Sequence, residues 1–315
     1  MLIMTVLDPL AVFPPECRQG VVTLGHFDGA HLGHAALLAA ARDLAARLGS
    51  DVPVVAVTFE PHARAVLRPD LPAPAPLTLL ADRLDALRTI GANHAVAIAP
   101  TAELLGLSAQ EFFDRVVVNG LAAQGLVEGP DFCFGKGRSG TMQTLSELCQ
   151  RGGLELIETA PVTLNGEAVS STRIRMAIES GDVCLAGNLL GRPYRLRGTV
   201  VTGDQRGRTL GFPTANLSCA TLVPGPGVYA AKAILANGHT WPAAVHLGPS
   251  PTFGVKLPRV EAHLIGFVGN LYGELLTLDF VARLREPARF ASPDLLVQQL
   301  NRDIAMAKAT MEPLP

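Results

Sequence analysis

Two histidines three residues apart stand where a strand pattern gives way to a helix pattern. The stretch Gly25–His34 reads GHFDGAHLGH and contains His31 and His34. Side chains at this spacing project from one side of a helical turn, so both imidazoles can donate hydrogen bonds to one phosphate group. The glycines let backbone N–H groups approach an anion, and a helix N-terminus adds a positive partial charge. The stretch predicts a nucleotide phosphate site, although its spacing is neither Gly-x-Gly-x-x-Gly nor that of a Walker loop.

A second polar stretch, Ser170–Arg175, reads SSTRIR and opens another helix far along the chain. Its three hydroxyls and two guanidinium groups can bind a polyphosphate. Each stretch also has a simpler interpretation. The first is then a capped helix whose histidines are exposed or complete the cap, and the second is an N-cap followed by solvated arginines. The presence of both stretches in one chain favours phosphate binding.

A third candidate combines glycines with side chains that carry oxygen. Residues 203–211 read GDQRGRTLG, and residues 212–216 read FPTAN. Glycines give a loop the freedom to fold over phosphates. Thr214 and Asn216 face the same way in an extended segment, so they can jointly offer oxygen ligands to Mg²⁺. The alternative is an ordinary polar hairpin.

The first half of the chain alternates short β-branched runs with helical stretches rich in alanine and leucine, which is typical of an α/β fold. We expect strands at residues 21–24, 52–59, 94–99, 126–128 and 154–158. Helices are expected at residues 31–48 and 78–90, and Ser108 begins a further helix with Glu111 as its capping-box partner. Gly49 is a favoured stop for the first helix. The pattern predicts a doubly wound parallel sheet with a site above the carboxyl ends of its strands.

The second half reads as strand, turn and strand. Asn237-Gly238 lies between the apolar runs 228–235 and 240–246, and a two-residue hairpin turn of this type takes positive φ at both positions. Further strands at 259–267 and 274–284 predict a small antiparallel barrel. Ser292 and Pro293 begin a final helix that extends to about residue 310. Because the helix pattern gives way to the strand pattern near residues 187–193, we predict domains at 1–187 and 188–315.

Together these stretches resemble the His-x-Gly-His nucleotidyltransferases, and specifically the family of bacterial bifunctional riboflavin kinase/FMN adenylyltransferases. Residues 58–62 (TFEPH), 129–138 (GPDFCFGKGR) and 170–175 are similar to that family's first module, and residues 203–216, 260–264 (VEAHL) and 270–273 (NLYG) to its kinase module. The resemblance implies a Rossmann-like nucleotidyltransferase domain followed by a riboflavin kinase barrel. It also implies that ATP and Mg²⁺ convert riboflavin to FMN, and that ATP then adenylylates FMN to FAD with release of pyrophosphate.

The resemblance further implies roles for individual residues. His31 and His34 would stabilise the transition state of adenylyl transfer, and Glu261 would accept the proton of the flavin's ribityl 5′-hydroxyl. The ATP of adenylyl transfer would contact Gly25, Phe27, Asp28, His31, His34, Ser171, Thr172 and Arg175. The flavin of that step would contact Phe59, His62, Asp131 and Phe134. The ATP of the kinase step would contact Gly203, Gly207, Gly211, Thr214 and Asn216, and the last two would also bind Mg²⁺.

Some of these residues have alternatives. Asp28 either orients the turn or contacts a metal-bound water, and the flavin-side aromatic residues are as often part of a core. A lone glutamate on a strand, such as Glu261, usually faces solvent, although alternation places it on the same side as His263.

Five positions depart from the family pattern. Ala63 stands where proline is usual, and Cys133 stands where a basic residue is common. His246 and Ser250 replace a common asparagine and arginine, and Gly266 replaces an aspartate. None of these positions is assigned to phosphate or metal, so the departures concern the flavin site and the relative rates.

The composition of the 315 residues restricts the partners. With 26 basic and 28 acidic residues the net charge is −2, so no overall basic surface indicates binding to nucleic acid or an anionic membrane. The apolar stretches fall short of the roughly 20 residues of a membrane span. The N-terminus lacks the pattern of a signal peptide, and the five scattered cysteines favour neither disulfides nor zinc, so we expect a cytoplasmic protein.

The expected partners are the small molecules riboflavin, FMN and ATP. Three alternatives to the two-step enzyme remain. The first is an enzyme with only one of the two activities, the second is a transferase with another phosphate acceptor, and the third is a catalytically dead flavin-binding protein.

Overall fold

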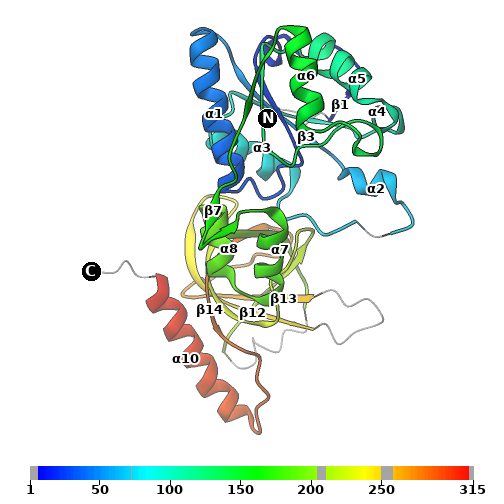
Figure 1. Ribbon diagram of the computed structural model, residues 1–315. Coiled ribbons are helices and arrows are strands. Elements are labelled where there is room, and N and C mark those ends of the chain that lie inside the picture. Colours follow the sequence, from blue (N-terminus) through cyan, green and yellow to red (C-terminus); the bar gives the residue numbers. More distant parts are fainter. Residues whose placement is uncertain (1–5, 72, 204–210, 250–257, 312–315) are drawn as a thin grey trace. The chain divides into compact units, whose positions relative to one another are not determined.

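The computed structural model of the chain describes residues 6–71, 73–203, 211–249 and 258–311. The chain forms two compact units, the first comprising residues up to 74 with 78–169, and the second comprising 75–77 with residues from 170 onward (Figure 1). The helices between residues 170 and 190 thus group with the second unit. The domain boundary at residue 187 stays a prediction.

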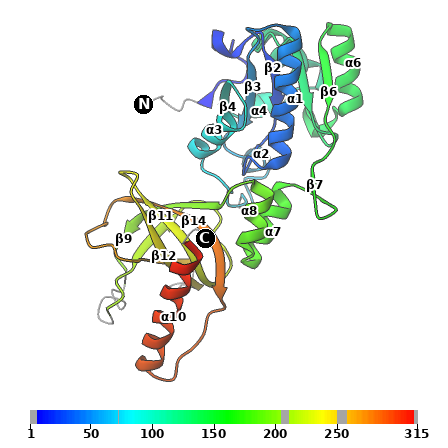
Figure 2. The ribbon, with the colours of Figure 1, turned by 90° about the vertical axis from the view of Figure 1, so that its left-hand side faces the viewer.

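A parallel sheet forms the centre of the first unit (Figure 2). Within the described residues its six strands lie in the order β1 (Val6–Leu7), β4 (His94–Ile98), β3 (Val54–Phe59), β2 (Val21–Leu24), β5 (Gly125–Glu128) and β6 (Glu155–Glu158). All neighbouring strands are parallel. From β2 the chain continues to β3 and β4 on one side and later to β5 and β6 on the other. The predicted doubly wound sheet is confirmed, and the carboxyl end of β2 lies at the switch point where such sheets bind ligands.

Helices contribute to two separate hydrophobic cores of the first unit. One core contains side chains of α1 (Leu32–Leu48) and α3 (Leu80–Thr89). The other contains side chains of α4 (Ala102–Gly106), α5 (Ala109–Phe112), η2 (Phe113–Gly120) and α6 (Met142–Gly152). As predicted, α1 ends at Gly49, and Ser108 and Glu111 form a capping box. The remaining elements are η1 (Pro15–Cys17), α2 (Ala63–Leu67), η3 (Lys136–Arg138) and the β7 (Thr163–Leu164) and β8 (Glu167–Ala168) pair.

The second unit begins with α7 (Ser171–Ser180) and α8 (Val183–Leu190) and continues as a barrel. The closed barrel has the antiparallel strand order β10 (Ala215–Cys219), β13 (Pro258–Leu264), β12 (Thr240–Pro249), β11 (Gly227–Leu235), β14 (Leu275–Arg285) and β9 (Tyr194–Val201). The terminal helix α10 (Pro293–Met311) packs against β11 and β12. The predicted barrel and terminal helix are confirmed. In the portion of the chain described, no helix is long and apolar enough to cross a membrane.

The turn between β11 and β12 corrects one prediction. The hairpin itself is confirmed, since Ile234 pairs with Thr240. Of the two turn residues, however, Gly238 has a positive φ of 84° and Asn237 does not. The N–H of Gly238 donates to the carbonyl of Leu235, and the N–H of Leu235 donates to the carbonyl of His239. The connection is therefore a three-residue loop that ends in a left-handed glycine, which relieves Asn237 of the strained conformation.

Candidate functional site

The two histidines of the Gly25–His34 stretch cap α1 at the carboxyl end of β2. Nδ1 of His31 accepts a hydrogen bond from the N–H of Gly33 at 3.1 Å, and Nδ1 of His34 accepts one from the N–H of His31 at 3.2 Å. A neutral imidazole that accepts at Nδ1 carries its proton on Nε2. The two rings stack with their centroids 3.6 Å apart and 18° between their planes. The cap therefore fixes both tautomers and places the proton of each of the two adjacent rings on Nε2.

Two glycines of this stretch make room for rings. A Cβ atom at Gly33 would lie 3.0 Å from Cε1 and 3.1 Å from Nδ1 of His31, a distance that side chains rarely tolerate. A Cβ atom at Gly25 would lie 3.3 Å from the ring of Phe27. The N–H of Gly25 donates to the carbonyl of Val57 on β3 at 3.0 Å, so it already has a partner in the sheet. The contact of Gly25 with ATP stays a prediction.

The turn before α1 has an unusual backbone. Phe27 and Ala30 have positive φ values of 48° and 43°, a conformation that residues other than glycine adopt at a cost in energy. The ring of Phe27 is 2% exposed and meets the ring of His34 edge-on, with centroids 5.0 Å apart. Phe27 thus supports one of the two stacked histidines from within the core.

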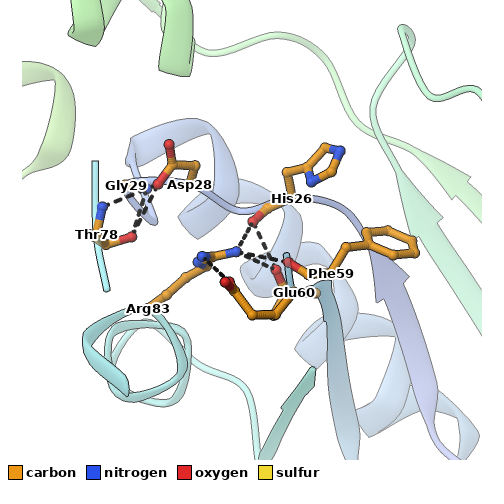
Figure 3. Close-up of polar contacts among 8 residues, drawn as sticks. His26, Asp28, Gly29, Phe59, Glu60, Thr78 and Arg83 are labelled. Atoms are coloured by element: carbon orange, nitrogen blue, oxygen red, sulfur yellow. Dashed lines mark hydrogen bonds and ion pairs between the residues drawn. The ribbon is translucent and has the colours of Figure 1, made fainter. Parts of the chain in front are cut away.

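Asp28 is held inside the same turn by Thr78 (Figure 3). Oδ1 of Asp28 accepts hydrogen bonds from the N–H of Thr78 at 3.2 Å and from its hydroxyl at 3.3 Å. The hydroxyl oxygen of Thr78 in turn accepts from the N–H of Gly29 at 3.3 Å. These contacts support the first of the two predicted roles of Asp28, which is to orient the turn.

Arg83 of α3 joins the ends of β2 and β3 (Figure 3). Its Nη1 donates to the carbonyls of His26 and Phe59 and to the hydroxyl of Thr58, each at 3.2 Å. Its Nη2 donates to the carboxylate of Glu60 at 2.9 Å. The side chain is 5% exposed, so these acceptors compensate the cost of burying its charge.

The sequence interpretation missed Arg83, although the sequence contains a signal for it. Arg83 follows Leu80 by three residues and precedes Leu87 by four, which places it on the apolar face of its helix. An arginine at such a position needs buried acceptors, and the ends of neighbouring strands supply them.

The four residues predicted on the flavin side have different surroundings. Phe59 is half-buried at the end of β3, and Asp131 is exposed. His62 caps α2, because its Nδ1 accepts from the N–H of Arg64 at 3.1 Å. Phe134 is 6% exposed and belongs to the hydrophobic core, which is the alternative that its aromatic character had left open. Contact of these residues with a flavin stays a prediction.

A buried carboxyl that the sequence interpretation missed lies at the switch point. Glu128 ends β5 and is 2% exposed, and its Oε1 accepts from the N–H of Leu24 at 2.7 Å. The pairing of β2 with β5 covers only Val21 and Val22, so on that side of β2 the Glu128 side chain accepts the hydrogen bond of the Leu24 N–H in place of a β5 carbonyl. Burial raises the pKa of Glu128 well above its usual value, although the hydrogen bond from Leu24 acts in the opposite direction.

The polar stretch at the start of α7 belongs to the second unit. Oγ of Ser170 accepts from the N–H of the third helical residue at 3.2 Å, so the N-cap of the simpler interpretation is present. Ser171 is half-buried and Thr172 is exposed in the first turn. Arg175 donates to the carbonyl of Ala75. Binding of ATP phosphates by Ser171, Thr172 and Arg175 stays a prediction.

The predicted metal ligands line a cavity of about 670 Å³ in the barrel unit. Thr214 and Asn216 contribute to its wall together with residues 267–272. Asn216 on β10 pairs directly with Glu261 on β13. A Cβ atom at Gly203 would lie 2.2 Å from Nδ2 of Asn216, so only glycine fits there beside this side chain. The structure thus brings together Gly203, Asn216 and Glu261.

Like Gly203, two further glycines belong to the predicted phosphate segment, and residues 267–272 form one wall of the cavity. Gly211 has a φ of 85°, which favours glycine, whereas Gly207 lies outside the described residues. Residues 267–272 were not predicted to line a site. The sequence signal that could have indicated them is the apolar Val268 directly before the turn residues Gly269 and Asn270. In the structure the Val268 side chain is 95% exposed.

Glu261 is half-buried and has two basic neighbours. Nδ1 of His246 lies 3.3 Å from its Oε2, and Nη1 of Arg259 lies 3.4 Å from its Oε1. The hydrogen bond from His246 holds the pKa of Glu261 below its usual value, and the charge of Arg259 adds to this effect against the opposing effect of burial. Glu261 is therefore ionised at neutral pH and able to accept a proton.

His263 lies on the same strand face as Glu261 and contacts the segment that carries the predicted metal ligands. Its Nδ1 lies 2.8 Å from the carbonyl oxygen of Pro213, and its ring meets that of Phe212 edge-on at 6.0 Å. The intervening residue Ala262 is fully buried, so the predicted alternation along β13 is confirmed.

The five departures from the family pattern fall at different places. His246 contacts Glu261 directly. Ala63 is the first residue of α2, and Cys133 is a half-buried free thiol. Gly266 has a φ of 83°, a conformation that glycine adopts without strain. Ser250 lies outside the described residues.

Comparisons with known proteins match both units. A family model described as FAD synthetase matches residues 14–173, and a family model described as riboflavin kinase matches residues 190–311. A bifunctional riboflavin kinase/FMN adenylyltransferase of Pseudomonas fluorescens is 40% identical over 301 residues, which are 95% of each chain. The protein of the same description from Bacillus subtilis (strain 168) is 34% identical over 304 residues, 95% of this chain and 94% of its own.

A solved structure resembles nearly the whole chain. The crystal structure described as a macrolide-efflux protein from Streptococcus pneumoniae has a TM-score of 0.86 and 32% sequence identity. The match covers 96% of this chain and 97% of that chain.

Proposed function

The chain belongs to the family of bifunctional riboflavin kinase/FMN adenylyltransferases, and we propose on this premise that it produces FAD from riboflavin in two ATP-dependent steps. The first step transfers a phosphoryl group from ATP to riboflavin and gives FMN and ADP. The second transfers an adenylyl group from ATP to FMN and gives FAD and pyrophosphate. The observation that carries this proposal is that each family model matches a separate part of the chain with its own phosphate-type motif.

We assign adenylyl transfer to the stacked histidines of the first unit. The phosphate of FMN attacks the α-phosphorus of ATP in line, so the protein has to position the reactants and stabilise charge. The Nε2–H groups of His31 and His34 are the donors for the α-phosphate. Asp28 and Phe27 keep the turn and the rings in place. Ser171, Thr172 and Arg175 at the start of α7 and Gly25 are assigned to the same ATP, by resemblance to the family.

The flavin of this step is assigned to the ends of the strands beside the motif. Phe59 and His62 are half-buried there and offer aromatic surface. Asp131 and Phe134 are assigned by resemblance. Because Phe134 lies in the core, we assign it an indirect contribution. Its ring supports that of Phe132, which stacks on it with the centroids 5.5 Å apart.

We assign the kinase step to the face of the barrel unit that carries Asn216 and Glu261, beside the cavity that Thr214 and Asn216 line. Glu261 accepts the proton of the ribityl 5′-hydroxyl, since it is ionised and lies opposite Asn216. The oxygens of Thr214 and Asn216 fit Mg²⁺, which commonly completes its ligands with phosphate oxygens and water. When bound, the ion neutralises charge on the phosphates of ATP. Gly203, Gly207 and Gly211 belong to the segment assigned to those phosphates.

We also propose that residues 1–187 and 188–315 act as separate domains and that the protein works in the cytoplasm. The cysteines Cys17, Cys133, Cys149, Cys184 and Cys219 are all free, which suits a reducing compartment.

Product analysis tests the proposed function. Purified protein supplied with riboflavin, ATP and Mg²⁺ is expected to form FMN and then FAD. Formation of neither product would refute the proposal, and formation of one product would favour the alternative with a single activity.

The division of labour is tested with paired variants. We expect His31→Ala to stop the reaction at FMN, with adenylyl transfer lowered about 10²- to 10³-fold by loss of one donor. Glu261→Ala is expected to block FMN formation and to spare the conversion of supplied FMN. His239→Ala, at an exposed hairpin turn, is the histidine control. Equal loss of both steps in each variant would contradict the assignment.

A further inference from the structure

The ring of His26, which the preceding assignments do not use, lies flat on the ring of His62. Their centroids are 3.9 Å apart, and the planes are within 1° of parallel. The ring of Phe59 is 5.4 Å from that of His26 and tilted by 56°. Three aromatic rings from the ends of β2 and β3 and the start of α2 thus form one cluster at the carboxyl edge of the first unit's sheet.

The backbone of His26 is fixed by two side chains (Figure 3). Its carbonyl accepts from the hydroxyl of Thr58 at 2.8 Å and from Nη1 of Arg83 at 3.2 Å. The same Nη1 donates to the carbonyl of Phe59. One buried guanidinium thus holds together the two backbone segments from which the rings of His26 and Phe59 project.

The ring of His26 is neutral near pH 7. Burial, together with the nearby His62 and Arg83, lowers the pKa of His26 to about 4. His62 accepts a hydrogen bond at Nδ1 from Arg64, so this cap needs the neutral ring with its proton on Nε2. Within the described residues, Nδ1 of His26 is buried without a hydrogen-bond partner. Stacking on His62, and not hydrogen bonding, therefore accounts for the placement of the His26 ring.

We propose that His26 is a positioning residue for FMN in adenylyl transfer, because its ring holds the His62 ring at the orientation in which His62 contacts the flavin. The inference rests on the proposed function, in which His62 lies on the flavin side of the first unit. The isoalloxazine ring system is flat and aromatic, and such surfaces bind aromatic side chains whose orientation is fixed in advance.

Three substitutions at this position separate the ring from its polar atoms. His26→Phe keeps an aromatic ring for stacking, His26→Asn keeps a polar atom without the ring, and His26→Ala keeps neither. His94→Asn is the matched control, because it removes a histidine from the opposite, amino end of β4. The measurements are KM and kcat for conversion of supplied FMN to FAD, with riboflavin phosphorylation by the same preparation as the test of folding.

We expect KM for FMN to rise roughly 2- to 12-fold in His26→Ala and His26→Asn, which is the fold-change that corresponds to the free energy of one aromatic pair. The value of kcat should stay unchanged. His26→Phe is expected to restore KM to within about twofold of wild type. An unchanged KM in His26→Ala, a loss confined to kcat, or a His26→Phe enzyme no better than His26→Ala would each overturn the inference. Failure of the wild-type protein to form FAD would instead overturn the proposed function on which it rests.

Discussion

Replacement of Gly33 by alanine is expected to slow adenylyl transfer while leaving the stability of the protein nearly unchanged. Gly33 lies in the first turn of α1, where its N–H donates to Nδ1 of His31. Alanine is favoured over glycine in a helix by about 1 kcal/mol. The new Cβ atom, however, would lie 3.0 Å from Cε1 and 3.1 Å from Nδ1 of His31. The ring must therefore move by a few tenths of an ångström away from its capping position.

The structure gives the magnitude of both effects. Loss of the cap costs about 1 kcal/mol, which offsets the gain in helix propensity, so we expect the free energy of unfolding to stay within about 1 kcal/mol of wild type. A displacement of about 1 Å can cost about 10²-fold in rate, so a few tenths of an ångström corresponds to a roughly three- to tenfold lower kcat for FMN adenylylation.

The assay follows the conversion of supplied FMN to FAD, with chemical denaturation as the measure of stability. Gly106→Ala is the control, because a Cβ atom at this helical glycine meets nothing within 4 Å. The riboflavin kinase rate of Gly33→Ala should equal that of wild type. Wild-type adenylylation by Gly33→Ala would show that the position of the His31 ring does not limit the reaction.

Three further predictions concern other residues. His246→Ala removes the hydrogen bond that lowers the pKa of Glu261, so the acid limb of the kinase pH–rate profile should move to higher pH; an unmoved limb would contradict Glu261 as the base. Glu128→Gln keeps an acceptor for the Leu24 N–H. Because the folded-state pKa of Glu128 is raised, its contribution to stability is present below its unfolded pKa and is lost as pH rises. In urea unfolding, the glutamine variant should therefore become increasingly more stable than wild type between about pH 5 and 8. A difference in stability that does not change with pH would contradict this account. Gly203→Ala should raise the kinase KM for ATP while sparing adenylylation of FMN, since its Cβ would meet Asn216; equal KM values would show that the Asn216 position is not critical.

Local sequence signals predicted the elements and their order well. The capping box of Ser108 and Glu111 and the stop at Gly49 depend on residues within one or two turns, so the chain itself contains the whole cause. The parallel sheet and the barrel follow from the change in hydrophobic period. The predicted type of the turn at Asn237 was wrong, because a two-residue loop and a three-residue loop share the same Asn-Gly signal and differ only in strand register.

Contacts between distant residues were beyond the sequence. Arg83 meets acceptors that lie 23 to 57 positions away, and Glu128 meets the N–H of Leu24 over a separation of 104. The ring of His26, which follows β2, meets that of His62, which follows β3. Such pairs depend on which strand ends are neighbours, and that order is a property of the folded sheet.

The capping role of His31 and His34 and the catalytic role that we propose for them depend on one arrangement. A serine or aspartate at the start of α1 would satisfy the same N–H groups, so the cap alone does not call for imidazole. An imidazole that accepts at Nδ1, however, must hold its proton on Nε2, on the side away from the helix backbone. The cap thereby orients two donors without further residues, and Gly33 is required because the first ring lies over it. The simpler interpretation, in which the histidines complete a helix cap, is therefore compatible with the proposed binding of a phosphate group, because the cap itself orients the two donors.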